Sequence, residues 1–278
     1  MKLPKDEPDP SEFHWSALEA TGELLSDRDK EKSRLKNAAY TSYLLQVRPD
    51  MVRVQGIYVD EDRFRLVVSD ACGVFDTGYL DWKLRPFRLL LCAWIWRLYE
   101  PVLDPSITIN VERKERITFN VKVPEVPDAE YLGCKIISAG TAFGRRTIVF
   151  ECPKPKMIIK EQYIETTRRF AEGPILAKIH ENGTFPGVVR LGSCGRVVGS
   201  NEEDLVVESN ESVRRKTRVT LLDQAPSIMD AKTLRDALVA MYDLLESEFF
   251  ARDHGASLIP QTSHPVSLQK TQDTTSRY

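Results

Sequence analysis

The 278-residue sequence predicts an α+β protein: an N-terminal α/β module, an antiparallel sheet with one inserted helix, and the beginning of a helical region. Three observations predict this class. Short alternating apolar segments, typical of strands, occur at 50–76 and again from 131 onward. Two helical patterns stand at 85–99 and 230–246. A Pro-rich segment at 123–130 separates the two blocks of strands and is the predicted domain boundary.

The composition indicates a soluble globular protein, with 42% hydrophobic and 29% charged residues. The formal net charge is -2, so the charge balance favours neither nucleic acid nor an anionic membrane as a partner. The five cysteines form no C-x-x-C pair and the four histidines lack zinc-ligand spacing, so no metal site is predicted. Scattered thiols in an odd number suit a reducing compartment, and we expect the cytoplasm or the nucleus.

The first half of the chain is predicted element by element. Residues 1–35 read as disordered or as a loose helix, with the helical option over 16–36, and the module follows at 36–122. The module begins with a hairpin whose strands, 50–59 and 63–70, flank Asp60, and a short strand follows at 71–78. The apolar run at 87–99 is too short to cross a bilayer and predicts a buried helix on this sheet. Residues 101–127 read as a loop with one or two strands.

The second half, 128–223, contains strand patterns in quick succession. They lie at 131–140, 145–152, 156–160, 187–199 and 217–223. A short helix is expected near Glu172, because Pro174 is tolerated only in a first helical turn. The polar stretch 200–216 reads as a long surface loop. Residues 224–255 are expected to hold an amphipathic helix at 230–246, and 256–278 a disordered tail.

Five strands with a helix after the third is the order of elements in a protein kinase small lobe. Such a lobe needs a lysine that binds ATP phosphates and a glutamate that holds the lysine in place. Lys160 ends the third strand, and Glu172 follows it by 12 residues at the start of the helix. A strand ending in lysine and a helix beginning with glutamate are also common without any such function, and the order of strands favours the functional interpretation.

The other expected nucleotide contacts are less distinctive. Gly140 and Gly144 lie between the first two strands, with Ala142 where a G-x-G-x-x-G loop would have glycine. They fit either a phosphate-binding turn or an ordinary hairpin. Leu222, within 221–224, would lie beside an adenine ring. No H-R-D or D-F-G motif occurs, and the Arg252–Asp253 pair lacks the preceding histidine, so no catalytic residue or metal ligand is assigned.

Several segments in a fixed order resemble the fungal-type protein kinase family of basidiomycetes, over about residues 40–246. The quoted segments are "VQGIYVDEDRFRLVVSDACGVFDTGYLDW", "FRLLLCAWIWRLYEPVLDPSITI", "SAGTAFGRRTIVFE", "MIIKEQY" and "TLLDQAPSIMDAKTLRDALVAMYDLLE". The resemblance implies a kinase fold, ATP with magnesium, and phosphorylation of protein Ser/Thr or Tyr. By position it gives Lys160 and Glu172 the ATP roles.

The resemblance breaks near Ser247, before the catalytic loop, so we expect a truncated kinase with little or no phosphotransferase activity alone. Two other interpretations remain open. One is a non-catalytic pseudokinase or interaction module that binds a protein partner. The other is a nuclease-like N-terminal module built on Asp104, Glu112 and Lys114.

Overall fold

The fold is α+β, as predicted, and strands dominate it. A computed structural model describes residues 18–24, 30–112, 116–124, 126, 129–168, 170–181, 183–184, 188–224, 232–235, 238 and 242. Met1–Thr184 together with Val189–Ala225 form one compact unit, and Phe185–Val188 with Pro226–Tyr278 form a second. The three helices and the strands named below all belong to the first unit.

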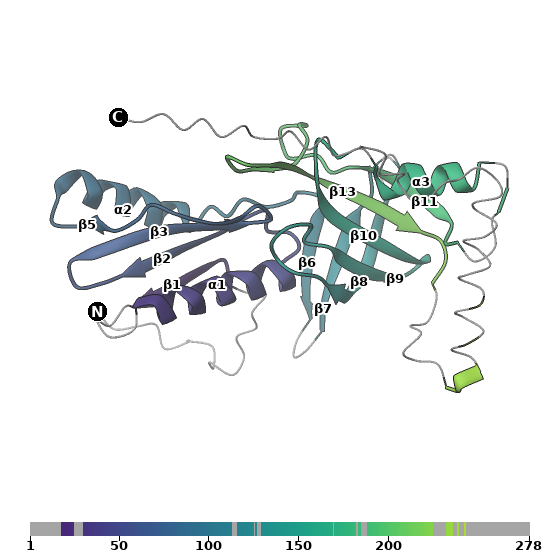
Figure 1. Cartoon of the computed structure of the whole chain (residues 1–278), viewed down its shortest axis with the longest axis horizontal. Coiled ribbons are helices and arrows are strands. Elements are labelled where there is room, and N and C mark those ends of the chain that lie inside the picture. The colour runs from purple at the N-terminus through teal and green to yellow at the C-terminus, as the bar shows by residue number, and fades with distance from the viewer. Residues whose placement is uncertain are drawn as a thin grey trace, which may run out of the picture. The chain divides into compact units, whose positions relative to one another are not determined.

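The first sheet is formed by the N-terminal part of the chain. Its strands are β1 (Ala20–Leu24), β2 (Val54–Val59), β3 (Arg63–Asp70), β4 (Gly73–Asp76) and β5 (Leu80–Asp81). Their order is β1-β2-β3-β4, with β5 also beside β3; β1 and β2 are parallel and the other pairs are antiparallel. The predicted hairpin is therefore confirmed as β2–β3. Figure 1 shows helices α1 (Lys30–Val47) and α2 (Arg85–Arg97) on opposite sides of this sheet.

Strand β1 and the first part of helix α1 occupy the stretch that the sequence predicts to be disordered or loosely helical, and α1 then continues to Val47 in the predicted module. The difference arises because the face of α1 toward the sheet is partly polar. Thr21 donates a hydrogen bond to Asn37 at 2.9 Å, and Ser69 donates one to Thr41 at 3.1 Å. All four residues are buried, and these bonds satisfy their hydroxyl groups and the Asn37 Oδ1, whereas the Asn37 Nδ2 has no partner among the described residues. Such a helix lacks the apolar stripe on which sequence recognition depends.

Helix α2 is not buried, so the prediction of a buried helix at 85–99 is wrong. It has no fully buried residue, and only the side with Phe87, Leu91 and Trp94 is half-buried. The Trp94 indole donates to the Gly56 carbonyl at 3.1 Å, which attaches this side to β2. Trp96 is 71% exposed, because α2 is apolar around more of its circumference than one sheet face can cover.

The second sheet has eight strands. They are β6 (Ile107–Glu112), β7 (Arg116–Lys122), β8 (Glu130–Ala139), β9 (Ile148–Pro153), β10 (Lys156–Glu165), β11 (Leu191–Arg196), β12 (Val206–Glu208) and β13 (Val213–Leu221). The order is β11-β13-β10-β9-β8-β7-β6, and β12 also pairs with β13. Hairpin β6–β7 precedes the predicted boundary at 123–130, yet it extends this sheet by pairing with β8.

Strands β8, β9, β10, β13 and β11 with helix α3 (Glu172–Ile179) form the unit that the sequence predicts. The helix lies between the third and fourth of these strands in the chain. The interpretation of 200–216 as a surface loop is wrong. This stretch contains β12 and the first part of β13, and its Leu205 and Val207 are buried against Tyr163 and Val197. Leu205 and Val207 are two alternating apolar residues in a polar stretch, and so short a pattern does not predict a buried strand.

The main core of the second sheet includes Ile107, Phe119, Phe150 and Ile159. The same core contains a disulfide between Cys134 and Cys152, whose Cα atoms lie 4.3 Å apart on the neighbouring strands β8 and β9. The sequence analysis treated all five cysteines as scattered thiols. Their separation of 18 positions in the sequence conceals their proximity, because only the hairpin register brings them together.

Two further outcomes concern the rest of the chain. Among the described residues, no helix combines the length and the apolar composition needed to cross a bilayer. The predicted helix at 230–246 and the predicted tail at 256–278 lie mostly or wholly outside the described residues. Within 230–246 the structure describes 232–235, 238 and 242, of which 234, 235, 238 and 242 are helical.

Candidate functional site

Lys160 and Glu172 form an ion pair. The Lys160 Nζ lies 2.6 Å from the Glu172 Oε2, and both side chains are about two-thirds buried. Lys160 is on the middle strand β10, opposite Val149 of β9 and Val219 of β13. Glu172 is the first residue of α3, so the helix does begin at this glutamate. The two residues that the sequence predicts to be partners are thus brought together.

A close approach between α3 and β11 holds Glu172 in place. A Cβ atom at Gly173 would lie 2.4 Å from the Cβ of Cys194 and 2.6 Å from its Sγ. Only glycine lets the first turn of α3 come this near to the sheet. Since Glu172 precedes Gly173 directly, the same contact sets the position of its carboxylate relative to Lys160.

Gly140 and Gly144 lie in the β8–β9 turn, which packs on the N-terminal part of the chain. The Gly144 N–H donates to the Ala71 carbonyl at 2.7 Å, and Gln46 of α1 donates to the Gly140 carbonyl at 2.9 Å. Ala142, between the glycines, is buried in a cluster with residues of α1. Gly144 has a φ of +88°, which explains the glycine at this position.

Arg146 anchors this turn, although Arg145 and Arg146, as arginines at a turn, are expected from the sequence to be solvated or to add positive charge near a phosphate. Its guanidinium donates to the carbonyls of Leu45, Arg48 and Met51 at 2.7 to 3.0 Å, and to that of Val52 at 3.4 Å. These carbonyls belong to the last turn of α1 and the residues after it. The last carbonyls of a helix have no N–H partner within the helix. The side chain is only 2% exposed. Arg146 is therefore a buried C-terminal cap of α1 supplied by a distant turn.

Leu222 follows β13 directly, at the predicted adenine-side segment. Its N–H donates to the Arg190 carbonyl at 3.0 Å, and its side chain is 44% exposed. The next two residues also have partners: Asp223 pairs with Arg190 at 2.6 Å, and Gln224 donates to Glu151 at 2.5 Å. The Arg190 hydrogen bonds lower the pKa of Asp223 to about 2. Leu222 therefore lies in an ordered segment at the end of β13.

On the opposite face of β10 lies a buried cluster of four charges. Lys216 Nζ lies 2.7 Å from Asp104 and 3.0 Å from Glu161, while Arg218 lies 3.2 Å and 2.8 Å from the same two carboxylates. All four side chains are almost completely inaccessible to solvent. Two positive and two negative charges make the cluster neutral, which is the condition under which buried charges are tolerated.

The cluster perturbs the titration of its members. Burial alone would raise the pKa of Asp104, but Lys216 and Arg218 outweigh it and hold that pKa well below its usual range. Burial alone would lower the pKa of Lys216, and the two carboxylates instead raise it. The Asp104 carboxylate is thus buried and paired with Lys216 and Arg218, so it is not available to bind a metal ion or substrate. This removes the support for the nuclease interpretation. Lys114 and the side chain of Glu112 lie outside the described residues.

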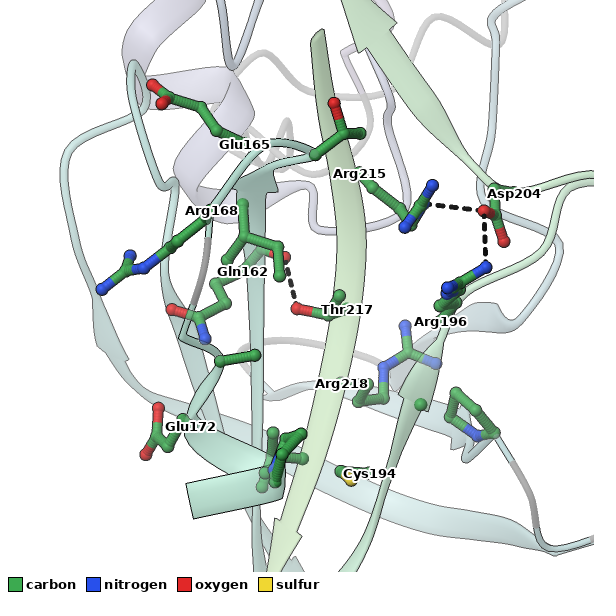
Figure 2. Close-up of a pocket in the computed structure, with 18 of the residues that line it drawn as sticks. Gln162, Glu165, Arg168, Glu172, Cys194, Arg196, Asp204, Arg215, Thr217 and Arg218 are labelled. Atoms are coloured by element: carbon green, nitrogen blue, oxygen red, sulfur yellow. Dashed lines mark hydrogen bonds and ion pairs between the residues drawn. The ribbon is translucent and has the colours of Figure 1, made fainter. Parts of the chain in front are cut away.

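A cavity of about 850 Å³ opens beside the N-terminus of α3, and we refer to it as the α3 pocket. Figure 2 shows its lining, which includes Gln162, Arg168, Glu172 and Cys194. Of the residues predicted to bind the nucleotide, only Glu172 lines this pocket. The α3 pocket therefore adjoins the nucleotide site that the sequence predicts, shares Glu172 with it, and otherwise has a different lining. Within the described residues, no three His, Cys, Asp or Glu side chains are grouped to hold a metal ion.

These features define the class of the protein. Five antiparallel strands in this order, with a lysine on the third paired to a glutamate on the inserted helix, are the small lobe of a protein kinase. A family model described as fungal protein kinase matches residues 2–274, so the chain belongs to this family. No curated protein matches the chain, and no solved structure does.

The family match extends beyond the resemblance found from sequence, which covered about 40–246. It includes the N-terminal residues before the module and most of the segment after Ser247. The sequence does contain a pattern that indicates the charged cluster. Lys216 and Arg218 are two residues apart in a strand, so they point to one face, and Glu161 stands directly after Lys160 on the paired strand.

Proposed function

We propose that this chain binds ATP through its kinase-like small lobe and does not transfer phosphate by itself. The observation that carries the proposal is the Lys160–Glu172 ion pair at 2.6 Å. In a kinase, a lysine held this way binds the phosphate oxygens of ATP. Absence of H-R-D and D-F-G from the 278 residues supports the non-catalytic part, because these motifs supply the base and the magnesium aspartate.

The residues present fit part of what ATP requires. Lys160 is only partly buried and would bind phosphate oxygens, while Glu172 would orient its ammonium group. Leu222 is partly exposed and would contact the adenine. Magnesium would reach the site with the nucleotide, whose phosphates supply oxygen ligands. We also propose that the protein is located in the cytoplasm or the nucleus, which requires the Cys134–Cys152 disulfide to persist in a reducing compartment.

The contribution of the β8–β9 turn to phosphate binding is a separate part of the proposal. Gly140 and Gly144 fit it less well than Lys160 does. The Gly144 N–H is bonded to Ala71, and the Gly140 N–H is bonded to Thr147, both at 2.7 Å. Neither amide can donate to a phosphate without giving up this bond. We therefore expect Lys160 to dominate phosphate binding.

The test measures binding of ATP with magnesium by calorimetry in the unmodified chain and in K160M. We expect K160M to weaken binding by about ten-fold or more, since a charge-assisted contact to phosphate is lost. The matched control is K156M, because Lys156 is an exposed lysine on the same strand. Equal affinity in K160M and K156M would refute the assignment of Lys160.

A second candidate function is a non-catalytic module that binds a protein partner. It is favoured by the exposed apolar side of α2, where Leu89 is 62% and Trp96 is 71% exposed. Surfaces of this kind in soluble proteins often mark interaction sites. The same calorimetry separates the two candidates. Absence of saturable ATP binding would leave the interaction module as the better interpretation.

A further inference from the structure

We propose that the α3 pocket is a second binding site, adjoining the Lys160 site, and that it takes a phosphate monoester. The argument rests on three independent features of the pocket: the balance of its charges, an unpaired side-chain amide on a nearly buried residue, and the uncapped start of α3. This inference does not depend on ATP binding at Lys160.

The charges around the α3 pocket do not balance. The lining contains three carboxylates, those of Glu165, Glu172 and Asp204, and four arginines, Arg168, Arg196, Arg215 and Arg218. Every carboxylate already has a cation. Glu165 pairs with Arg214 at 3.0 Å, and Glu172 pairs with Lys160. Asp204 lies 2.7 Å from Arg215 and 3.5 Å from Arg196, so two cations share it (Figure 2).

Two positive charges therefore remain without a carboxylate among the described residues. Arg218 belongs to the neutral buried cluster and adds nothing to this excess. One uncompensated charge comes from the pair that shares Asp204. The other is Arg168, whose guanidinium has no partner in the described part of the chain. A phosphate monoester carries a charge of about -1.5 to -2 at pH 7 and would pair with Arg168, whereas Arg196 and Arg215 lie across the pocket from it (Figure 2).

Gln162 supplies a specific polar contact. The residue is only 6% exposed and lines the pocket, and its side-chain amide has no hydrogen-bond partner among the described residues. Figure 2 shows this side chain on the side of the pocket that also carries Arg168 and Glu172. The amide of this nearly buried residue is accessible only through the pocket side, so a ligand that accepts a hydrogen bond here would use a donor that has no partner among the described residues.

The start of α3 supplies further donors. Ala171, Glu172 and Gly173 all line the pocket, and no side chain caps the helix at Ala171. The first N–H groups of a helix have no partner within the helix and attract anions. The carboxylate of Glu172 does not oppose this, because Lys160 neutralises it. Arginine and helix amides together favour phosphate, since the guanidinium fork matches its oxygens.

The cavity volume of about 850 Å³ is within the range of small-molecule sites and leaves room for the group that carries the phosphate. That group could be a phosphorylated side chain or a nucleotide. Three probes separate these sources: inorganic phosphate, O-phosphoserine and ATP, each titrated by calorimetry and by amide NMR. We expect inorganic phosphate and phosphoserine to bind saturably and to shift the amide signals of Glu172 and Gly173.

Variants locate the binding. R168Q removes an exposed charge, so folding is not at risk, and it should weaken binding of phosphate and phosphoserine about ten-fold. Q162L should also weaken it. R97Q, which removes an exposed arginine on α2, is the matched control and should not change it. If R168Q weakens ATP binding as strongly as K160M does, the nucleotide is the source of the phosphate in this pocket.

Equal affinities in R168Q and R97Q would overturn the proposal. So would the lack of saturable binding of both phosphate and phosphoserine at millimolar concentrations. Failure of the ATP proposal is recognised separately, because it concerns K160M and ATP, whereas the α3 pocket is judged from R168Q and phosphate.

Discussion

Removing Asp104 from the buried cluster should destabilise the protein strongly. D104N leaves Lys216 and Arg218 facing a single carboxylate, that of Glu161, and so leaves one uncompensated positive charge in the interior. Breaking a buried ion pair in this way costs about 3–5 kcal/mol. K216M leaves one uncompensated negative charge and should cost a similar amount.

The double variant D104N/K216M provides the decisive comparison. It leaves Arg218 and Glu161 as a neutral pair at 2.8 Å. Its cost should therefore be close to that of one single variant rather than the sum of both, which corresponds to a coupling free energy of about 4 kcal/mol. The control is D62N, the same substitution in an exposed pair with Lys83.

The assay is urea unfolding followed by tryptophan fluorescence and circular dichroism. At a urea dependence of about 2–2.5 kcal/mol per molar, a cost of about 4 kcal/mol lowers the midpoint by roughly 1.5–2 M. D62N should leave the midpoint unchanged. Additive effects of D104N and K216M would refute the reasoning, because they would mean that the two charges do not stabilise one another.

Two further predictions follow from the same contacts. R146Q should lower the free energy of unfolding by about 3 kcal/mol or more, because several carbonyls at the end of α1 lose a charged donor; exchange of the Gly144 amide should accelerate, whereas the exposed neighbour in R145Q should have little effect. Stability should also depend on pH with a defined sign. Asp104 has a lowered pKa, so its contribution is complete above about pH 4 and declines as the pH falls below that value; Lys216 has a raised pKa, so its contribution is lost only above about pH 10.5. Urea midpoints measured between pH 2 and 11 check this, and a D104N variant that retains the full acid dependence would contradict it.

Strand positions in the second sheet could be predicted because alternation of apolar residues is local. Strands β8, β9 and β10 each lie where the pattern places them, and the ion pair between Lys160 and Glu172 follows from their order. The start of α3 could be predicted from Pro174, which is compatible only with a first turn. These inferences needed no knowledge of contacts between distant segments.

Other features depend on such contacts and could not be predicted. Helix α1 has polar residues, Asn37 and Thr41, on its buried face, and their partners come from β1 and β3. Helix α2 was expected to be buried because it is apolar, but composition does not reveal how much sheet is available to cover it. The acceptors of Arg146 lie about 100 residues earlier in the chain, so nothing near Arg146 indicates that it is buried.

The capping of α1 by Arg146 has a consequence for any attempt to isolate the kinase-like lobe. A fragment that begins at residue 128 would contain Arg146 without the carbonyls that accept its hydrogen bonds, and Lys216 without Asp104. The cut would also expose the apolar surface that Ala142 shares with α1, and it would leave Lys216 and Arg218 with Glu161 as their only carboxylate. The smallest fragment able to fold must therefore include α1 as well as the segment around Asp104. The predicted domain boundary at 123–130 is therefore not a position at which the chain can be cut to give a folded lobe.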